Sequence, residues 1–398
     1  MFCPAFDAGR CHSCTLLALP YEQQLAGKQA RVEGLLAAYD ELTWEPPVGS
    51  REAGYRNKAK LVVGGTLDTP TLGILDADHR GVDLQDCLLY DERLTAAFPA
   101  LAAFVTRAGL TPYAVPERTG ELKHVLVTVS PDGELMVRLV LRSTEALARI
   151  GKHLTSLLAE LPQVAVASVN VLPQHAALLE GDREILLTEA SALRMRLNGI
   201  DLWLRPQGFF QTNTDIAARL YREAAAWLSD EPWSSLWDLF SGVGGFALHA
   251  PTPLAVTPPA TKQVAAPPAA APPAATPVPR VLGVETSEAA VAGARLSAAA
   301  AGVTAEFVAA DATAFALASS SPPDVVVVNP PRRGIGATLA GWLESSGVQR
   351  VLYSSCNAES LVTDLAAMPS LRPVRGRLLD MFPQTAHDEV LVDLRRTP

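Results

Sequence analysis

The second half of the chain alternates short runs of apolar and β-branched residues with alanine-rich stretches. Runs of strand length occur at 236–240, 281–284, 324–328 and 350–353, and helix-compatible stretches occur at 287–301 and 338–346. Short, continuously apolar strands are typical of parallel sheets, because helices cover both faces of such sheets. The pattern therefore predicts an α/β, Rossmann-like domain over residues 196–398.

The first half of the chain shows a different pattern. Runs with strand character at 60–63, 125–129 and 136–140 stand between turn signals such as Pro131-Asp132-Gly133. Short strands joined by tight turns are typical of an antiparallel or mixed sheet. We therefore expect a separate α+β domain over residues 1–195, with the domain boundary near residue 195.

Residues 251–280 interrupt the pattern of the second half. This segment holds 10 of the chain's 31 prolines, and most of its other residues are Ala, Thr and Val. Proline removes backbone donors, so we expect a Pro/Ala-rich insert that is exposed, extended or disordered. A linker between two domains is the alternative. It is disfavoured because a strand, a glycine turn and a helix start precede the segment, and another strand follows it.

Composition and charge narrow the class of protein. A chain of 398 residues suits two domains, and 48% hydrophobic against 19% charged residues is typical of a soluble globular protein. The formal net charge of −9 counts against a general polyanion binder, so any RNA contacts must be local. The sequence shows neither a run of roughly 20 apolar residues nor a signal peptide. We expect a cytoplasmic protein without membrane contact and without an obligate protein partner.

A glycine-rich turn, Ser241-Gly242-Val243-Gly244-Gly245, follows the first strand of the C-terminal domain. Such turns let a nucleotide approach the backbone closely, although a tight turn without a ligand is the alternative. Glu285 ends the next strand, 43 residues after Gly242, and the insert accounts for 30 of these residues. A carboxylate at this position accepts hydrogen bonds from a ribose. Asn329-Pro330-Pro331-Arg332 follows a third strand and adds polar groups at the same edge, unless it is only a turn that ends the strand.

Cys356 follows the fourth strand, in Tyr353-Ser354-Ser355-Cys356-Asn357, and would place a thiol at this edge. A lone cysteine in such a position is often a small buried apolar residue, which is the alternative. A thiolate that adds to carbon 6 of uracil creates an enolate whose carbon 5 can attack the methyl group of a sulfonium. A base must then remove the carbon 5 proton. His387 and Glu389 are candidates for that base, just before the last predicted strand.

The other four cysteines fall mostly at the N-terminus, and they are Cys3, Cys11, Cys14 and Cys87. Cytoplasmic cysteines rarely form disulfides, so a metal centre explains them better than disulfides do. Four thiolates suit structural zinc or an iron–sulfur cluster, and the spacing does not choose between the two. Four unrelated buried cysteines remain the other alternative. A metal centre would tie the N-terminus to the loop at Cys87, in a structural role.

As a set, these motifs resemble a known family, the bacterial uracil-5-methyltransferases of 23S ribosomal RNA that carry an iron–sulfur cluster. The landmarks are FFQTN at 209–213, DLFSGVGGF at 238–246, GVE at 283–285, NPPRRG at 329–334, YSSCN at 353–357 and DMFPQTAHDEV at 380–390. One departure is Ser241, where relatives often have Cys. The resemblance implies S-adenosylmethionine-dependent methylation of carbon 5 of a uridine in 23S rRNA. The compact N-terminal start is most similar to the subgroup that acts on uridine 747.

The resemblance also implies roles for individual residues. Cys356 would be the nucleophile and Glu389 would take the carbon 5 proton, while His387 would support the site. Contacts to S-adenosylmethionine are implied for Gln211, Phe240, Glu285 and Asn329. A 4Fe–4S cluster in the RNA-binding N-terminal domain is implied for Cys3, Cys11, Cys14 and Cys87.

Two groups of cations are candidates for the RNA contacts. Arg56, Lys58 and Lys60 lead into a strand and would project from one face, as a track for phosphates. A strand edge protected by charge is the alternative for this group. Arg332 and Arg333 form the second group, beside the predicted site.

Three other functions remain open. The chain could methylate another rRNA or tRNA uridine, or an exocyclic amine of a nucleobase, or it could be a metal-containing RNA-binding protein without catalysis. Amine methylation is disfavoured because such enzymes usually have an aromatic residue where this chain has Arg332. Cytosine-5 methylation is disfavoured because its second cysteine is missing from the loop at 329–332.

Overall fold

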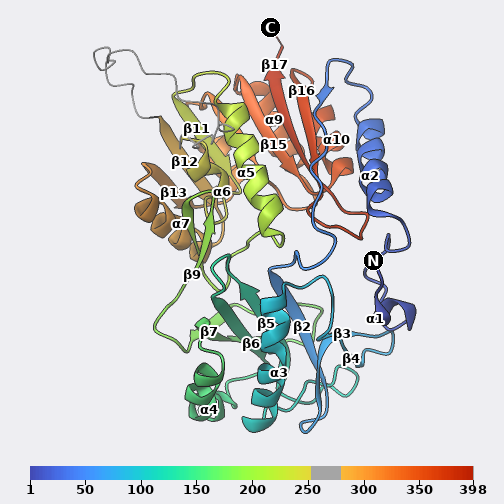
Figure 1. Cartoon of the computed structure of the whole chain (residues 1–398). Helices are drawn as coiled ribbons and strands as arrows, with labels where there is room; N and C mark the ends of the chain where they lie inside the picture. The colour runs from blue at the N-terminus through green and yellow to red at the C-terminus, as the bar shows by residue number, and fades with distance from the viewer. Residues whose placement is uncertain (252–278, 398) are drawn as a thin grey trace, which may run out of the picture.

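The computed structural model describes residues 1–251 and 279–397, and two large sheets dominate it (Figure 1). One sheet has eight strands and belongs mainly to the second half of the chain, and the other has seven strands from the first half. The hairpin of β9 (Leu193–Leu197) and β10 (Ile200–Leu204) lies between them. The predicted insert falls almost wholly on residues 252–278, which lie outside the described residues.

The eight-stranded sheet has the order β1-β16-β17-β15-β14-β11-β12-β13. Its strands are β1 (Thr43–Trp44), β11 (Ser235–Leu239), β12 (Arg280–Glu285), β13 (Ala305–Ala309), β14 (Val325–Val328), β15 (Arg350–Ser355), β16 (Leu371–Leu379) and β17 (Glu389–Arg396). The five strands from β15 to β13 are parallel, and β17 runs antiparallel to both of its neighbours. This topology confirms the predicted α/β architecture of the C-terminal half.

Helices cover both faces of this sheet, which is why all four residues of β14 are buried. One face carries α5 (Thr214–Leu228), α6 (Gly245–His249) and α7 (Glu288–Ala301). The other face carries α2 (Tyr21–Leu35), α8 (Ala312–Ala318), α9 (Gly336–Ser345) and α10 (Ala358–Ala366). The helices predicted at 287–301 and 338–346 correspond to α7 and α9.

The seven-stranded sheet is mixed and has the order β4-β3-β2-β5-β6-β7-β8. Its strands are β2 (Lys58–Gly65), β3 (Pro70–Leu75), β4 (Gly81–Asp83), β5 (Leu122–Val129), β6 (Leu135–Leu141), β7 (Val164–Val171) and β8 (Arg183–Leu186). Helices α3 (Glu92–Arg107) and α4 (Leu147–Glu160) cover one face and form a core of their own with it. The short α1 (Pro4–Asp7) lies beside the β3–β4 edge in Figure 1.

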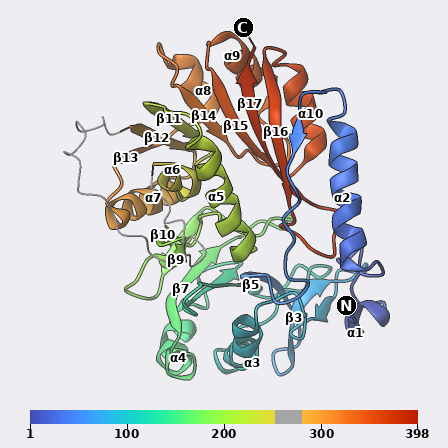
Figure 2. The ribbon, with the colours of Figure 1, turned by 45° about the horizontal axis from the view of Figure 1, so that its top comes forward.

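Residues 21–48 lie on the C-terminal sheet, although they belong to the first half of the chain. β1 pairs with β16 through Thr43 and Trp44, and α2 lies alongside α10 in both views (Figure 2). The domain boundary at residue 195 stays a prediction. Residues 21–48 precede this boundary in sequence but pack on the C-terminal sheet. Within residues 1–251 and 279–397, no helix is long and apolar enough to cross a membrane.

Candidate active site and cysteine cavity

Four predicted site residues lie at the end of a strand, or just after it, at one edge of the eight-stranded sheet. Leu239, the last residue of β11, pairs with Val284 near the end of β12 and with Val328 at the end of β14. These three strands therefore end at the same level of the sheet. The residues at these strand ends are Phe240, Glu285, Asn329 and Cys356. The chain passes from β11 to β12 and β13 and then returns to β14 on the other side of β11. Ligands of open α/β sheets bind at such a reversal of strand order.

The glycine turn between β11 and α6 has a strained and closely packed backbone. Phe240 has a φ of 72°, in the left-handed region that residues with a Cβ rarely adopt. A Cβ on Gly245 would lie 2.3 Å from the Tyr221 ring of α5, so glycine is required where the turn meets this helix. Strained residues of this kind are found mainly at ligand and active sites, which supports a ligand at this turn.

Glu285 connects the tip of β12 to the glycine turn. One carboxylate oxygen accepts a hydrogen bond from the Gly242 N–H (3.1 Å), and the other accepts one from the Ser287 N–H (2.9 Å). The Thr286 hydroxyl also donates to the carboxylate (3.1 Å). An ionised carboxylate has about four acceptor positions, so acceptor capacity remains for a ribose hydroxyl.

Two buried polar atoms lie at this turn without a partner, and our sequence analysis did not identify them. Asp238 Oδ1 and Ser241 Oγ have no hydrogen-bond partner in the part of the chain that the structure describes. The other oxygen of Asp238 accepts from the Ala247 N–H (3.0 Å). Burial, helped by the charge of Glu285, raises the pKa of Asp238 to about 7. Unpartnered buried polar atoms are rare and costly, so both are candidates to face a ligand or an ordered water.

Gln211 lies in the loop that enters α5, close to the start of the other sheet. Its backbone carbonyl accepts a hydrogen bond from Asn57 Nδ2 (2.9 Å), and its side chain is buried. Two residues later, Asn213 caps α5 by accepting from the Ile216 N–H (3.3 Å). These contacts fix the loop between the two sheets.

Cys356 and Glu389 lie at adjacent positions because β15 and β17 are antiparallel. Ser355 of β15 pairs with Val390 of β17, so the next residue on each strand is Cys356 and Glu389, respectively. The hydroxyl of Ser354 donates a hydrogen bond to the buried Glu389 carboxylate. Burial raises the pKa of Glu389 to about 7. Burial and the charge of Glu389 raise the pKa of Cys356 to about 11, and the cation of Arg332 opposes that shift.

The loop that follows Asn329 is tied to the loop of Cys356. Asn357 Nδ2 donates to the carbonyl of Arg332 (3.0 Å). The carboxylate of Asp364, in α10, also connects the two segments: it accepts hydrogen bonds from the Tyr353 hydroxyl (2.6 Å) and from the Ile335 N–H (2.9 Å). The two loops therefore hold each other in place beside the thiol.

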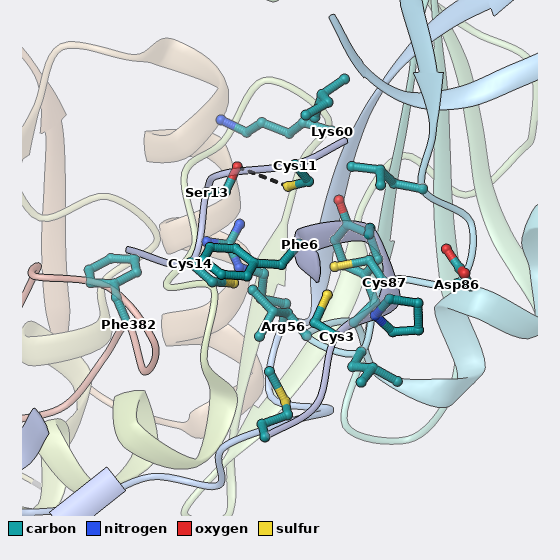
Figure 3. A pocket seen from close by; sticks show the side chains of 18 of the residues that line it. Cys3, Phe6, Cys11, Ser13, Cys14, Arg56, Lys60, Asp86, Cys87 and Phe382 are labelled. Carbon is teal, nitrogen blue, oxygen red and sulfur yellow. Dashed lines mark hydrogen bonds between the residues drawn. The ribbon is translucent and has the colours of Figure 1, made fainter. Parts of the chain in front are cut away.

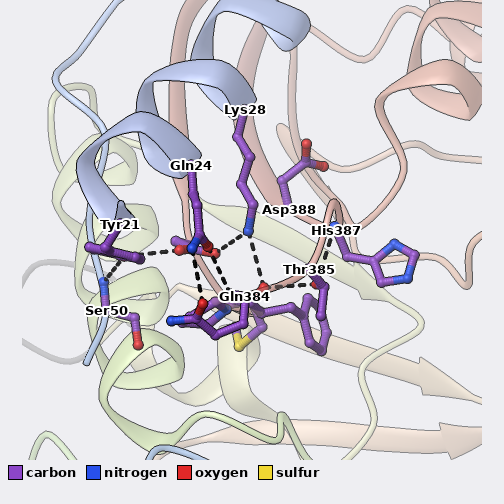
Figure 4. Close-up of polar contacts among 12 residues, drawn as sticks. Tyr21, Gln24, Lys28, Ser50, Gln384, Thr385, His387 and Asp388 are labelled. Atoms are coloured by element: carbon purple, nitrogen blue, oxygen red, sulfur yellow. Dashed lines mark hydrogen bonds and ion pairs between the residues drawn. The ribbon is translucent and has the colours of Figure 1, made fainter. Parts of the chain in front are cut away.

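The loop at 380–388, which leads to Glu389, is held by polar side chains of α2 (Figure 4). Lys28 Nζ lies 2.6 Å from one oxygen of the buried Asp380 carboxylate, and the Tyr21 hydroxyl donates to the other at 2.9 Å. Gln24 bonds to both the side chain and the backbone N–H of Gln384. His387, the other candidate base, points away from this network in Figure 4, and burial lowers its pKa.

The four remaining cysteines line one cavity of about 310 Å³ (Figure 3). Cys3, Cys11 and Cys14 come from the N-terminal segment, and Cys87 comes from the loop before α3. Burial, followed by the charges of the other three thiols, raises the pKa of Cys14 to about 11. Among the described side chains, no three of His, Cys, Asp or Glu form a ready-made metal site. The structure therefore gathers the four predicted ligands around one space without a preformed coordination shell.

The same cavity contains the first predicted group of cations. Arg56, Lys58 and Lys60 line it together with the cysteines, and Phe382 of the 380–388 loop lies in its wall (Figure 3). Burial lowers the pKa of Lys58 to about 8. The cations, the cysteines and the loop that leads to Glu389 thus meet at one place between the sheets.

Comparison with known proteins agrees with this geometry. The family model described as tRNA (Uracil-5-)-methyltransferase matches residues 193–397. A protein of Edwardsiella ictaluri named 23S rRNA (uracil(747)-C(5))-methyltransferase RlmC is 46% identical over 100% of this chain and 99% of its own. The protein of the same name from Cronobacter sakazakii is 45% identical over 100% of both chains.

A solved structure shows the same fold. The Pyrococcus abyssi tRNA (uracil-54, C5)-methyltransferase, in complex with S-adenosyl-L-homocysteine, superposes with a TM-score of 0.74. It is 24% identical, and the match covers 96% of this chain and 85% of that one. Because the family model spans half of the chain and the RlmC proteins align along its whole length, this chain belongs to the (uracil-5-)-methyltransferase family.

Proposed function

We propose that the protein methylates carbon 5 of one uridine in 23S rRNA, at the position numbered 747, with S-adenosylmethionine as methyl donor. The proposal is supported by relatives named for this reaction that align with the whole chain at 45–46% identity. It places the protein in the cytoplasm, where ribosomal RNA is its substrate. Another rRNA or tRNA uridine is the nearest alternative target.

The observation that carries the proposal is the register that places Cys356 opposite Glu389 at the edge of the eight-stranded sheet. A thiol beside a buried carboxyl supplies a nucleophile and a base, and methylation at carbon 5 requires both. Methylation of an exocyclic amine requires no nucleophile from the protein. The pair therefore favours the carbon 5 reaction.

The reaction follows from the positions of these groups. Bound S-adenosylmethionine supplies an electrophilic methyl group on its sulfonium. The Cys356 thiolate adds to carbon 6 of the uracil, and the electron pair of the C5–C6 double bond forms an enolate. Carbon 5 of this enolate takes the methyl group, whose bond to the sulfonium sulfur breaks and releases S-adenosylhomocysteine. Glu389 then takes the carbon 5 proton, the double bond re-forms, and the sulfur of Cys356 leaves carbon 6. The positive charge of Arg332 favours the thiolate, because it opposes the rise that burial and Glu389 cause in the pKa of Cys356.

We assign S-adenosylmethionine to the sheet edge where the glycine turn and the loop of Asn329 follow β11 and β14. Glu285 would accept the ribose hydroxyls, while Phe240, Asn329 and Gln211 would contact the rest of the molecule. The fit is supported by the left-handed Phe240 and by the unpartnered Asp238 Oδ1 at the turn. A bound ligand, or a water held by it, would give that oxygen its missing partner.

We assign a 4Fe–4S cluster to the cavity lined by Cys3, Cys11, Cys14 and Cys87. A four-iron cluster is larger than a single ion, so its thiolates can surround a cavity without forming a compact site beforehand. Burial, followed by the charges of the other three thiols, raises the pKa of Cys14, and binding to the cluster would stabilise its thiolate against both effects. The cluster would fix the N-terminal segment beside Phe382, which gives it a structural role.

Iron analysis tests this assignment. Protein purified without oxygen should be brown and contain about four irons per chain. Replacing Cys87 by Ser should remove the colour and most of the iron, whereas replacing Cys356 by Ser should remove neither. Colourless protein with one zinc per chain would reject the iron–sulfur cluster.

Methyl transfer tests the main proposal. Purified protein is incubated with labelled S-adenosylmethionine and 23S rRNA that lacks the modification, and the label is mapped by nuclease digestion and mass spectrometry. We expect the label on carbon 5 of uridine 747, and Cys356→Ala should lower the rate by about a thousandfold or more. Calorimetry with S-adenosylmethionine provides the control, because the variant should bind it like the wild type.

The other outcomes separate the alternatives. Label on another uridine would change the target but keep the mechanism. Label on an adenine or cytosine amine that persists in Cys356→Ala would reject the mechanism. RNA binding without S-adenosylmethionine binding would indicate a binding protein that has lost catalysis.

A further inference from the structure

A second cavity, of about 620 Å³, lies in the N-terminal domain. It shares no lining residue with the cysteine cavity or with the Cys356 site. Its walls are the loop at 113–118, the start of β5 and the loop at 175–179, and Val62 of β2 contributes to its lining. The reaction proposed above makes no use of this space.

The charged side chains that line this cavity are all basic. Arg118 and Lys123 line it together with His79, His124 and His175, and its lining contains no Asp or Glu. The chain as a whole has a net charge of −9, whereas the lining of this cavity is positively charged. A hollow lined by basic groups attracts anions and raises their local concentration.

Lys123 is the buried cation of this cavity, with 5% of its surface exposed. Its ammonium donates to the carbonyl of Gln174 (2.6 Å) and lies 4.7 Å from the centre of the Tyr113 ring. An ammonium has three donors, and these contacts use only one of them in a hydrogen bond. Burial lowers the pKa of Lys123, and an anion bound beside the ammonium would offset the cost of burying its charge.

The cavity also offers surfaces that suit a nucleobase. The Tyr113 hydroxyl lies 2.9 Å from His175 Nδ1 and orients this exposed imidazole. Leu178 and Leu179 beside it are 52% and 41% exposed. Unpaired bases of RNA stack on histidine rings and on arginine guanidinium planes. His124 Nδ1 is a buried atom without a partner among the described residues, so it is also a candidate to accept from a ligand.

The cavity is joined to the cysteine cavity by one face of β2. Val62 pairs with His124 at the second cavity, and Lys60 and Lys58 follow on the same face of β2 and line the cysteine cavity. Side chains of a strand alternate between faces, so these three residues are spaced by about 7 Å each. The face therefore forms a basic path from the second cavity to the loop that leads to Glu389.

We propose that this cavity binds one unpaired nucleotide of the RNA substrate, away from the target uridine. Its phosphate would contact Lys123 and Arg118, and its base would lie against His175 and the two exposed leucines. The inference rests on the proposed function, because it names a further contact with the same RNA. It explains how an acidic protein holds a polyanion through local cations.

Three variants with the same loss of charge test the proposal. Arg118→Gln and Lys123→Gln remove cations of the cavity, and Lys152→Gln removes an exposed cation from α4, which covers the opposite face of the sheet. Binding of an RNA transcript that contains uridine 747 and the nucleotides on both sides of it is measured across a series of salt concentrations. The slope of log affinity against log salt should fall by about 1 for each cavity variant and stay unchanged for Lys152→Gln. At saturating RNA the turnover of all three should remain within about twofold of wild type.

Arg118 is exposed, so its variant decides the question even where Lys123→Gln impairs folding. Equal salt slopes for Arg118→Gln and Lys152→Gln would overturn the proposal. A transcript carrying 4-thiouridine gives a second readout: crosslinks to the peptide with residues 175–179 support the cavity, and crosslinks found only near Cys356 and Lys58 exclude it. If the wild type transfers no methyl group, the proposed function fails, while the salt slopes still report on the cavity.

Discussion

At the scale of single residues, the ionisation of Glu389 sets the pH range of the reaction. Its carboxylate must be deprotonated to accept the carbon 5 proton, and burial raises its pKa to about 7. The deprotonated form of Glu389 is therefore present above this value and is lost as the pH falls through it, which sets the acidic limit of the reaction. We expect kcat, measured by methyl transfer at saturating substrates, to fall about tenfold per pH unit well below pH 7.

Glu389→Gln removes the base but leaves the nucleophile in place. The variant should complete addition and methylation but stall before the proton is removed, so turnover should fall by about 10² to 10⁴. A covalent protein–RNA adduct should accumulate and be visible by denaturing electrophoresis with labelled RNA. Glu306→Gln, at an exposed position of β13, is the matched control and should behave like the wild type. Wild-type turnover without an adduct in Glu389→Gln would assign the base to another residue.

Part of this site follows from sequence alone, because strand ends can be identified locally. Parallel strands end at one sheet edge, so the motifs at Phe240, Glu285, Asn329 and Cys356 predict one site before their distances are known. The contact of Glu389 with Ser354 depends on the antiparallel register of β17 with β15, which no local pattern specifies.

At the scale of elements, α2 is the part that the hydrophobic pattern did not reveal. Its buried face presents Gln24, Lys28 and Val32, so two of the three positions are polar. Gln24 and Lys28 bond to residues of the 380–388 loop, which lies more than 350 residues away in sequence. Polar residues usually mark the exposed face of a helix, so the sequence alone does not show that Gln24 and Lys28 are buried against the C-terminal domain.

Lys28→Met tests this contact between α2 and the loop. The variant leaves the buried Asp380 carboxylate without its cation, and breaking a buried ion pair costs about 3–5 kcal/mol. We expect a loss of this order in the free energy of unfolding, measured by urea denaturation, and a lower kcat because the loop leads to Glu389. Lys152→Met on the exposed side of α4 should change stability by less than about 0.5 kcal/mol. Equal stability of the two variants would show that the pair does not hold the loop.

At the scale of the whole molecule, average composition conceals the surfaces that matter. The net charge of −9 disfavours RNA binding, yet Arg56, Lys58 and Lys60 line one cavity, and Arg118 and Lys123 line another. The fold places each group in a cavity: Arg56, Lys58 and Lys60 lie in β2 or just before it, Lys123 lies in β5, and Arg118 lies in the loop between α3 and β5. Function at this scale depends on where the charges lie and not on their sum.

Replacing residues 252–278 tests whether stability and catalysis depend on this segment. The elements that flank it are anchored without it: α6 packs in the core beside α5, and β12 pairs with both β11 and β13. The predicted site residues all lie outside it. Replacing the segment by a short Gly–Ser linker should therefore leave the midpoint of thermal unfolding and kcat close to those of the full chain. Closing a loop of different length changes the free energy by only about 0.6 kcal/mol per doubling. A higher KM for RNA with unchanged kcat would instead assign the segment to RNA binding, and a large loss of kcat would show that catalysis requires it.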